Sequence, residues 1–134
     1  MAGPQPVIAE GGNYRVVVEG STVRMVVWRA PDLPSAAAAA DFERAAERVR
    51  GMVATLSALL LDAREAPKVA GPRTTAALTA LLGAFAARKK RVAIVCSDDA
   101  LQQLQFKRLV GETGAQYATI FGDLADAEQW LVAK

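Results

Sequence analysis

The sequence predicts a single-domain α/β protein in which a β-hairpin is followed by alternating helices and strands. Residues 14–29 are rich in β-branched side chains on both sides of a Gly-Ser pair, which is typical of a hairpin with a short turn. Short apolar runs without alternation occur at residues 57–62 and 91–97, as in strands that helices cover on both faces. A segment of helical period lies between these runs, and this spacing predicts parallel pairing through a right-handed crossover.

The first half of the chain supplies the hairpin and one helix. The hairpin strands are expected at residues 14–19 and 22–29, and Val26 and Trp28 add apolar cover to one face of the second strand. Residues 31–56 then switch to apolar side chains at helical spacing, with charged side chains outside the stripe. This pattern predicts an amphipathic surface helix.

Strands and helices alternate through the rest of the chain. The strands are expected at residues 57–62, 91–97 and 116–121. The helices are expected at residues 72–90, 99–114 and 122–134, the first opened by Pro72 and the last capped by Asp123.

The helix at residues 99–114 has widely spread apolar positions. Leu101 and Leu104 share one side with Leu109, whereas Phe106 and Val110 lie on a flank. Part of that flank is expected to be exposed.

Composition bounds the class of protein. At 134 residues the chain fits one domain, which we expect at residues 14–134 after a flexible N-terminal tail at residues 1–13. The formal charge of +2 is too small to draw in nucleic acid, and no apolar stretch reaches the ~20 residues of a membrane span. A single cysteine, Cys96, in an apolar run favours a reduced thiol in the cytoplasm.

The sequence contains few residues that could carry out catalysis. The chain has no histidine, which removes the commonest general base and every imidazole metal ligand. Asp62 has only Glu65 as a nearby second carboxylate, which is weak support for a metal site. The Gly71 region lacks the Gly-Lys-Ser/Thr ending of a phosphate loop. We therefore predict no enzyme, no catalytic residue, no cofactor and no metal.

The order of elements, the LLLDAR end of the third expected strand and the F-G-D-x-x-D-A-x-x-W-L run from Phe121 to Leu131 resemble the STAS superfamily. The resemblance is greatest to the SpoIIAA-like (STAS/SEC14-type) branch of small stand-alone domains. It implies a four- or five-stranded mixed sheet with about four helices mainly on one face. It also implies a bacterial regulatory protein that works by binding.

The same resemblance implies a candidate phosphorylation site. In the anti-sigma-factor antagonists of this superfamily, an aspartate that ends the third strand is followed almost directly by a serine that a partner kinase phosphorylates. Asp62 matches the aspartate, but no serine follows it, and the first hydroxyls are those of Thr74 and Thr75. We expect these threonines mainly to start the helix, with their hydroxyls at local N–H groups.

Two functional hypotheses follow. The first is a regulatory module that binds an unidentified partner protein through the joint after the third strand. Its candidate partner-binding residues are Asp62, Arg64, Glu65, Arg73, Thr74 and Thr75. The second is a carrier or sensor of a small apolar ligand or lipid, which requires a pocket between sheet and helices larger than close packing allows. Because the hairpin strands can present a sheet edge, we expect a monomer or a weak homodimer.

Overall fold

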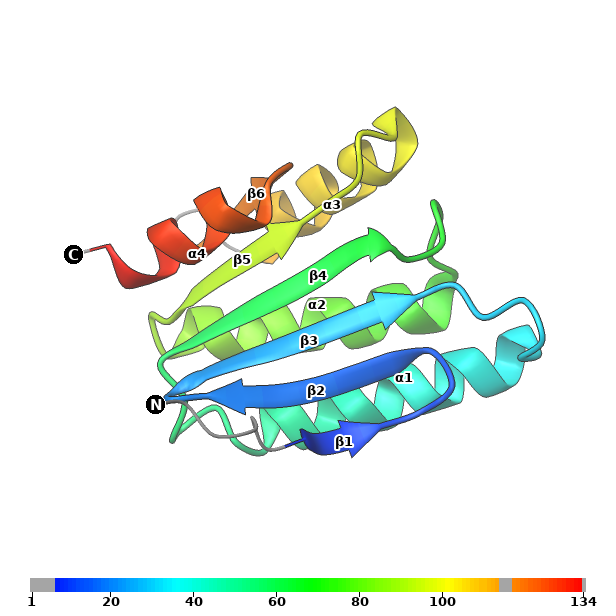
Figure 1. The fold of residues 1–134 in the computed structure, drawn as a ribbon, viewed down its shortest axis with the longest axis horizontal. Coiled ribbons are helices and arrows are strands. Elements are labelled where there is room, and N and C mark those ends of the chain that lie inside the picture. The colour runs from blue at the N-terminus through cyan, green and yellow to red at the C-terminus, as the bar shows by residue number, and fades with distance from the viewer. Residues whose placement is uncertain (1–6, 114–116, 134) are drawn as a thin grey trace.

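The structure is a computed structural model that describes residues 7–113 and 117–133. Six strands form one sheet in the order in which they follow along the chain (Figure 1). They are β1 (Val7–Glu10), β2 (Tyr14–Glu19), β3 (Thr22–Trp28), β4 (Ala58–Glu65), β5 (Arg91–Val95) and β6 (Ala118–Phe121). The first three strands pair antiparallel and the last four pair parallel, so the sheet is mixed.

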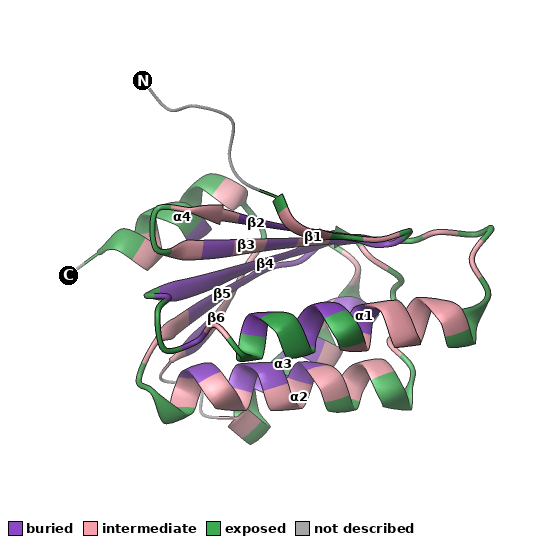
Figure 2. Cartoon of the chain, turned by 90° about the horizontal axis from the view of Figure 1, so that it is seen from below, coloured by how far each residue is buried: buried purple, intermediate pink, exposed green. Residues whose placement is uncertain are grey.

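The helices divide unequally between the two faces of the sheet. Three of them cover one face, namely α1 (Ser35–Arg50), α2 (Pro72–Ala87) and α3 (Ala100–Thr113), as Figure 2 shows. On the other face, α4 (Leu124–Val132) packs against β4, β5 and β6. The predicted α/β class, the hairpin and the placement of helices mainly on one face are confirmed. Within the described ranges, no helix has the length and apolarity needed to cross a membrane.

The sheet has six strands rather than four or five. The additional strand, β1, falls in the predicted flexible tail, so that prediction is wrong for residues 7–10; residues 1–6 lie outside the described ranges. Antiparallel hydrogen bonds to β2 hold β1, with Glu10 opposite Arg15. The hairpin is therefore not a sheet edge: β2 lies between β1 and β3, and β3, which carries Val26 and Trp28, lies between β2 and β4.

Alternation along β4 places its side chains in two separate cores. Leu59 and Leu61 belong to the large cluster beneath α1, α2 and α3, whereas Leu60 belongs to the small cluster beneath α4. All three are essentially inaccessible to solvent, as expected for a strand covered on both faces. β4 continues to Glu65, beyond the predicted end at residue 62, because Trp28 pairs with Glu65 after a register shift.

The burial of α3 differs from the prediction. Phe106 and Val110, expected on a partly exposed flank, are buried, and Leu101 and Leu104 are exposed. The helix instead places Gln102 in the core with Phe106 and Val110, at positions i, i+4 and i+8. A buried glutamine is tolerated here because its amide is fully engaged in hydrogen bonds, which are described below.

Candidate functional site

The candidate site lies where β4 ends and α2 begins. Residues 66–71 form the loop, and Gly71 is the N-cap of α2 with extended backbone (φ −71°, ψ 174°). No side chain caps the helix, and Pro72 at its start is confirmed. The prediction that threonine hydroxyls serve N–H groups is wrong for Thr75, because Thr75 Oγ1 instead donates to the carbonyl of Ala70 at 3.5 Å.

Asp62 and Arg64 form an ion pair beside α4. The Asp62 carboxylate accepts from the Arg64 backbone N–H at 3.2 Å, from Nε at 3.0 Å and from Nη2 at 2.8 Å. Asp62 alternates with Leu60, so its side chain lies on the face that carries α4. Partial burial opposes the charged carboxylate, but the Arg64 hydrogen bonds and the charges of Arg64 and Arg24 outweigh it and hold the pKa of Asp62 below its ordinary value.

The remaining charged candidates lie elsewhere. Arg73, in the first turn of α2, forms a bidentate ion pair with Glu43 of α1 on the exposed surface. The Arg73 hydrogen bond is the main reason why the pKa of Glu43 is lowered. Glu65 is exposed, and its carbonyl accepts from the Arg29 N–H at 2.8 Å. The six residues predicted from the sequence therefore do not form one contiguous surface.

Two glutamines of α3, which the sequence did not reveal, hold the loop in place. Gln105 exchanges two hydrogen bonds with Ala70: the Ala70 N–H donates to Oε1 at 3.0 Å, and Nε2 donates to the Ala70 carbonyl at 3.2 Å. Gln102, which is 1% exposed, donates from Nε2 to the carbonyls of Ala63 at 3.0 Å and Ala66 at 3.5 Å. The start and the end of the loop are thus both attached to α3.

Gln102 also attaches the turn between β5 and α3. Its Oε1 accepts from the Ser97 N–H at 2.8 Å and from the Ser97 hydroxyl at 2.9 Å. One side chain therefore joins the carboxyl ends of β4 and β5 to α3. The sequence contained no signal for this role, because the side of α3 that faces the core was not identifiable from its widely spread apolar residues.

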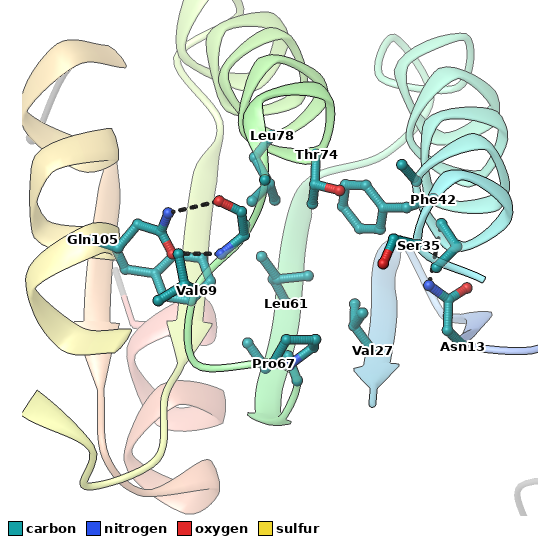
Figure 3. Close-up of a pocket in the computed structure, with 17 residues that line it drawn as sticks. Asn13, Val27, Ser35, Phe42, Leu61, Pro67, Val69, Thr74, Leu78 and Gln105 are labelled. Carbon is teal, nitrogen blue, oxygen red and sulfur yellow. Dashed lines mark hydrogen bonds between the residues drawn. The ribbon is translucent and has the colours of Figure 1, made fainter. Parts of the chain in front are cut away.

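A cavity of about 250 Å³ lies beneath the loop, between the sheet and the three helices of one face. Figure 3 shows its lining from β3, β4, α1, α2, α3 and the loop. Most of this lining is apolar, including Val27, Leu61, Phe42, Leu78 and Phe106. The cavity meets the requirement stated above for a ligand pocket between sheet and helices.

Four polar side chains line the same cavity: Asn13, Ser35, Thr74 and Gln105. Asn13 is 8% exposed, and its Nδ2 donates to the Ala38 carbonyl at 3.2 Å (Figure 3). Its Oδ1 is buried without a hydrogen-bond partner among the described residues. Both candidate phosphorylation sites lie in α2 and are half-buried: Thr74 lines the cavity, whereas the Thr75 hydroxyl donates to the Ala70 carbonyl of the loop.

Nucleophilic and metal-binding groups are sparse in this region. Cys96 is buried, and desolvation raises the pKa of its thiol to about 12, so the thiol stays protonated at neutral pH. Among residues 7–113 and 117–133, no three cysteine, aspartate or glutamate side chains are grouped as metal ligands would be.

The comparisons with known proteins inform the fold. No protein-family model matches the chain, and no curated protein sequence matches it. The NMR structure of the protein TM1081 is similar over 100% of both chains, with a TM-score of 0.59 and 10% sequence identity. This likeness shows that the whole chain adopts a fold already observed experimentally.

Proposed function

We propose that this protein is a non-catalytic, STAS-type regulatory module that binds a partner protein through the loop after β4 and the neighbouring surface of α3. One observation carries the proposal: three of the five large apolar side chains that are exposed among residues 7–113 and 117–133 lie at this place. Val69 of the loop is 56% exposed, and Leu101 and Leu104 of α3 are 54% and 59% exposed. Because Gln105 ties the loop to α3, we treat Pro67, Lys68, Val69, Leu101 and Leu104 as one loop–α3 surface.

The organisation of the loop supports this role. Its two ends are fixed by Gln102 and Gln105, and Lys68 is paired with Asp99 at 3.6 Å. Such anchoring reduces the conformational entropy that binding would otherwise remove from the loop. Lys68 adds a positive charge beside the apolar side chains. An opposite charge on the partner would then fix the orientation in which the partner binds.

The non-catalytic part of the proposal rests on the state of the reactive groups. Cys96 is protonated and buried, and the Asp62 carboxylate is occupied by three hydrogen bonds from Arg64. The chain contains no histidine to act as a base at neutral pH. Phosphorylation of Thr74 or Thr75 remains part of the proposal, since negative charge is favourable near the start of α2.

Affinity purification from the native cells, with quantitative mass spectrometry, tests the proposal. Lys68→Glu and Leu104→Asp should each lower recovery of the same partner at least tenfold, because both change exposed positions of the loop–α3 surface. Arg48→Glu, an exposed change on α1, is the matched control and should leave recovery unchanged. Equal recovery with all three variants would refute the loop–α3 surface.

The phosphorylation part needs its own variants. Thr74→Ala with Thr75→Ala should lower partner recovery only modestly if the threonines are structural. Thr75→Glu should abolish recovery only if phosphorylation regulates the partner. Phosphothreonine mapping of protein isolated from cells decides which case holds, and its absence together with full binding by Thr75→Glu would remove the switch.

A second candidate function is favoured by the cavity. A carrier or sensor of a small apolar ligand would hold its ligand beneath the loop, where Val27, Phe42 and Leu78 supply apolar contact. Native mass spectrometry of the protein purified from its own cells should then detect a retained small mass. A protein that carries no added mass under several growth conditions would count against the carrier function.

A further inference from the structure

The cavity beneath the loop has a lining that restricts the charge of any occupant. Seventeen residues line it, and none of them is Lys, Arg, Asp or Glu. A charged ligand would lose hydration there without meeting a side chain of opposite charge, which is unfavourable. The side chains of the lining therefore favour a neutral occupant.

Its size is restricted by the volume of the cavity. An engineered apolar cavity of about 150 Å³ binds benzene, so the cavity of about 250 Å³ has room for roughly ten non-hydrogen atoms. A long acyl chain exceeds this number, and the space is below the range of about 300–1,000 Å³ that is usual for drug-sized ligands. One or two small rings match the volume, whereas a membrane lipid does not.

The polar part of the lining is small. Ser35 and Thr74 place hydroxyls on it (Figure 3). Asn13 adds no free polar group, because Nδ2 is bonded to the Ala38 carbonyl and Oδ1 is buried away from any space that a water-sized molecule can enter. The lining therefore favours a mostly apolar occupant.

We propose that the cavity between the sheet and α1, α2 and α3 is a binding site for a small, neutral, mostly aromatic or alicyclic molecule. The loop at residues 66–71 covers this site, because five of its six residues line the cavity. The inference rests on the second candidate function and specifies its ligand class.

Indole is a suitable probe because it is neutral, bicyclic and mostly apolar. We expect amide chemical shifts to change at residues 66–71 and at the start of α1 when the full chain is titrated with indole. At about ten times its Kd, indole should raise Tm by about 3–6 °C. Indole-3-acetate, which adds a negative charge, should bind at least tenfold more weakly.

Two substitutions in α1 locate the site. Ala39→Leu places a larger side chain into the cavity wall and should lower indole affinity at least tenfold while the protein stays folded, because filling an apolar cavity is tolerated. Ala36→Leu is the matched control, since Ala36 is exposed and does not line the cavity. Equal affinity of both variants, or no binding by the wild type, would overturn the proposal.

The inference and the proposed functions can fail separately. Ala39→Leu changes the cavity but no residue of the loop–α3 surface, whereas Lys68→Glu and Leu104→Asp change that surface but not the cavity lining. Indole binding without a retained mass in protein from cells would support the site and count against the carrier function. Partner binding without indole binding would support only the regulatory module.

Discussion

Replacing Gln102 by methionine tests whether α3 holds the carboxyl ends of β4 and β5 together. Methionine has nearly the length and shape of glutamine and a similar helix propensity, so the substitution removes hydrogen bonds while largely conserving volume. The lost bonds are those to Ser97, Ala63 and Ala66. The perturbation is therefore confined to the polar contacts of one buried side chain.

The expected cost follows from what remains unpaired. The Ser97 N–H loses its Gln102 acceptor, which costs roughly 1–3 kcal/mol for a buried donor and less here because Ser97 is half-buried. The Ala63 carbonyl keeps a bond from the Ala66 N–H at 3.1 Å, so its loss is about 1 kcal/mol. We expect a total of about 2–3 kcal/mol, which a domain with 5–15 kcal/mol of stability survives.

Equilibrium unfolding in urea, followed by far-UV circular dichroism, measures this loss. With an m-value of about 1–3 kcal/mol/M, the midpoint should fall by on the order of 1–2 M without a change in m. Lys107→Met on the exposed side of the same helix is the control and should stay within about 0.5 kcal/mol of the wild type. If the two variants were equally stable, Gln102 would not hold the strand ends.

Three further predictions concern charge and reactivity. Asp62→Asn removes a carboxylate whose pKa lies below its ordinary 3.8. The wild type should therefore be more stable than this variant above about pH 4, and the difference should shrink as the pH falls further. A stability difference that is independent of pH would contradict the ion pair. Burial raises the pKa of Cys96 from 9.0 to about 12, so a thiol reagent at about pH 8 should modify it only after unfolding. The stability that the buried thiol form contributes should decline between about pH 9 and 12. Rapid labelling of the native protein would contradict this prediction, because it would show an accessible thiol. Lys90→Met removes an ammonium that donates to the carbonyls of Val53, at 2.6 Å, and Leu56, and should cost about 1.5–3 kcal/mol in urea unfolding; an unchanged midpoint would show that these bonds contribute nothing.

The sequence by itself determined the class of fold because each signal was local. The hairpin turn at Gly20, with φ 62°, and the cap of α4 by Asp123 depend on residues within a few positions of each other. The apolar run of β4 predicted a strand covered on both faces because burial on both sides requires apolar residues at every position. Hydrophobic period and capping were therefore sufficient for this part of the structure.

Only the tertiary structure decided where β1 pairs and how long β4 is. Val7–Glu10 is a short strand next to glycines, and it is held by a ladder to β2 that no local pattern predicts. The extension of β4 to Glu65 likewise depends on pairing with Trp28. Backbone pairing between distant segments overrides weak local preference in both cases.

The candidate site was decided by tertiary structure to a greater extent. Asp62 and Thr74 are close in sequence terms, but strand alternation sends Asp62 toward α4 and the start of α2 places Thr74 at the cavity on the other face. From the sequence alone, Gln102 cannot be distinguished from the other polar residues of α3, because the side of the helix that faces the sheet is not known. The cavity depends on how closely three helices approach the sheet, and the volume left between them is a property of packing in three dimensions that a linear pattern does not contain.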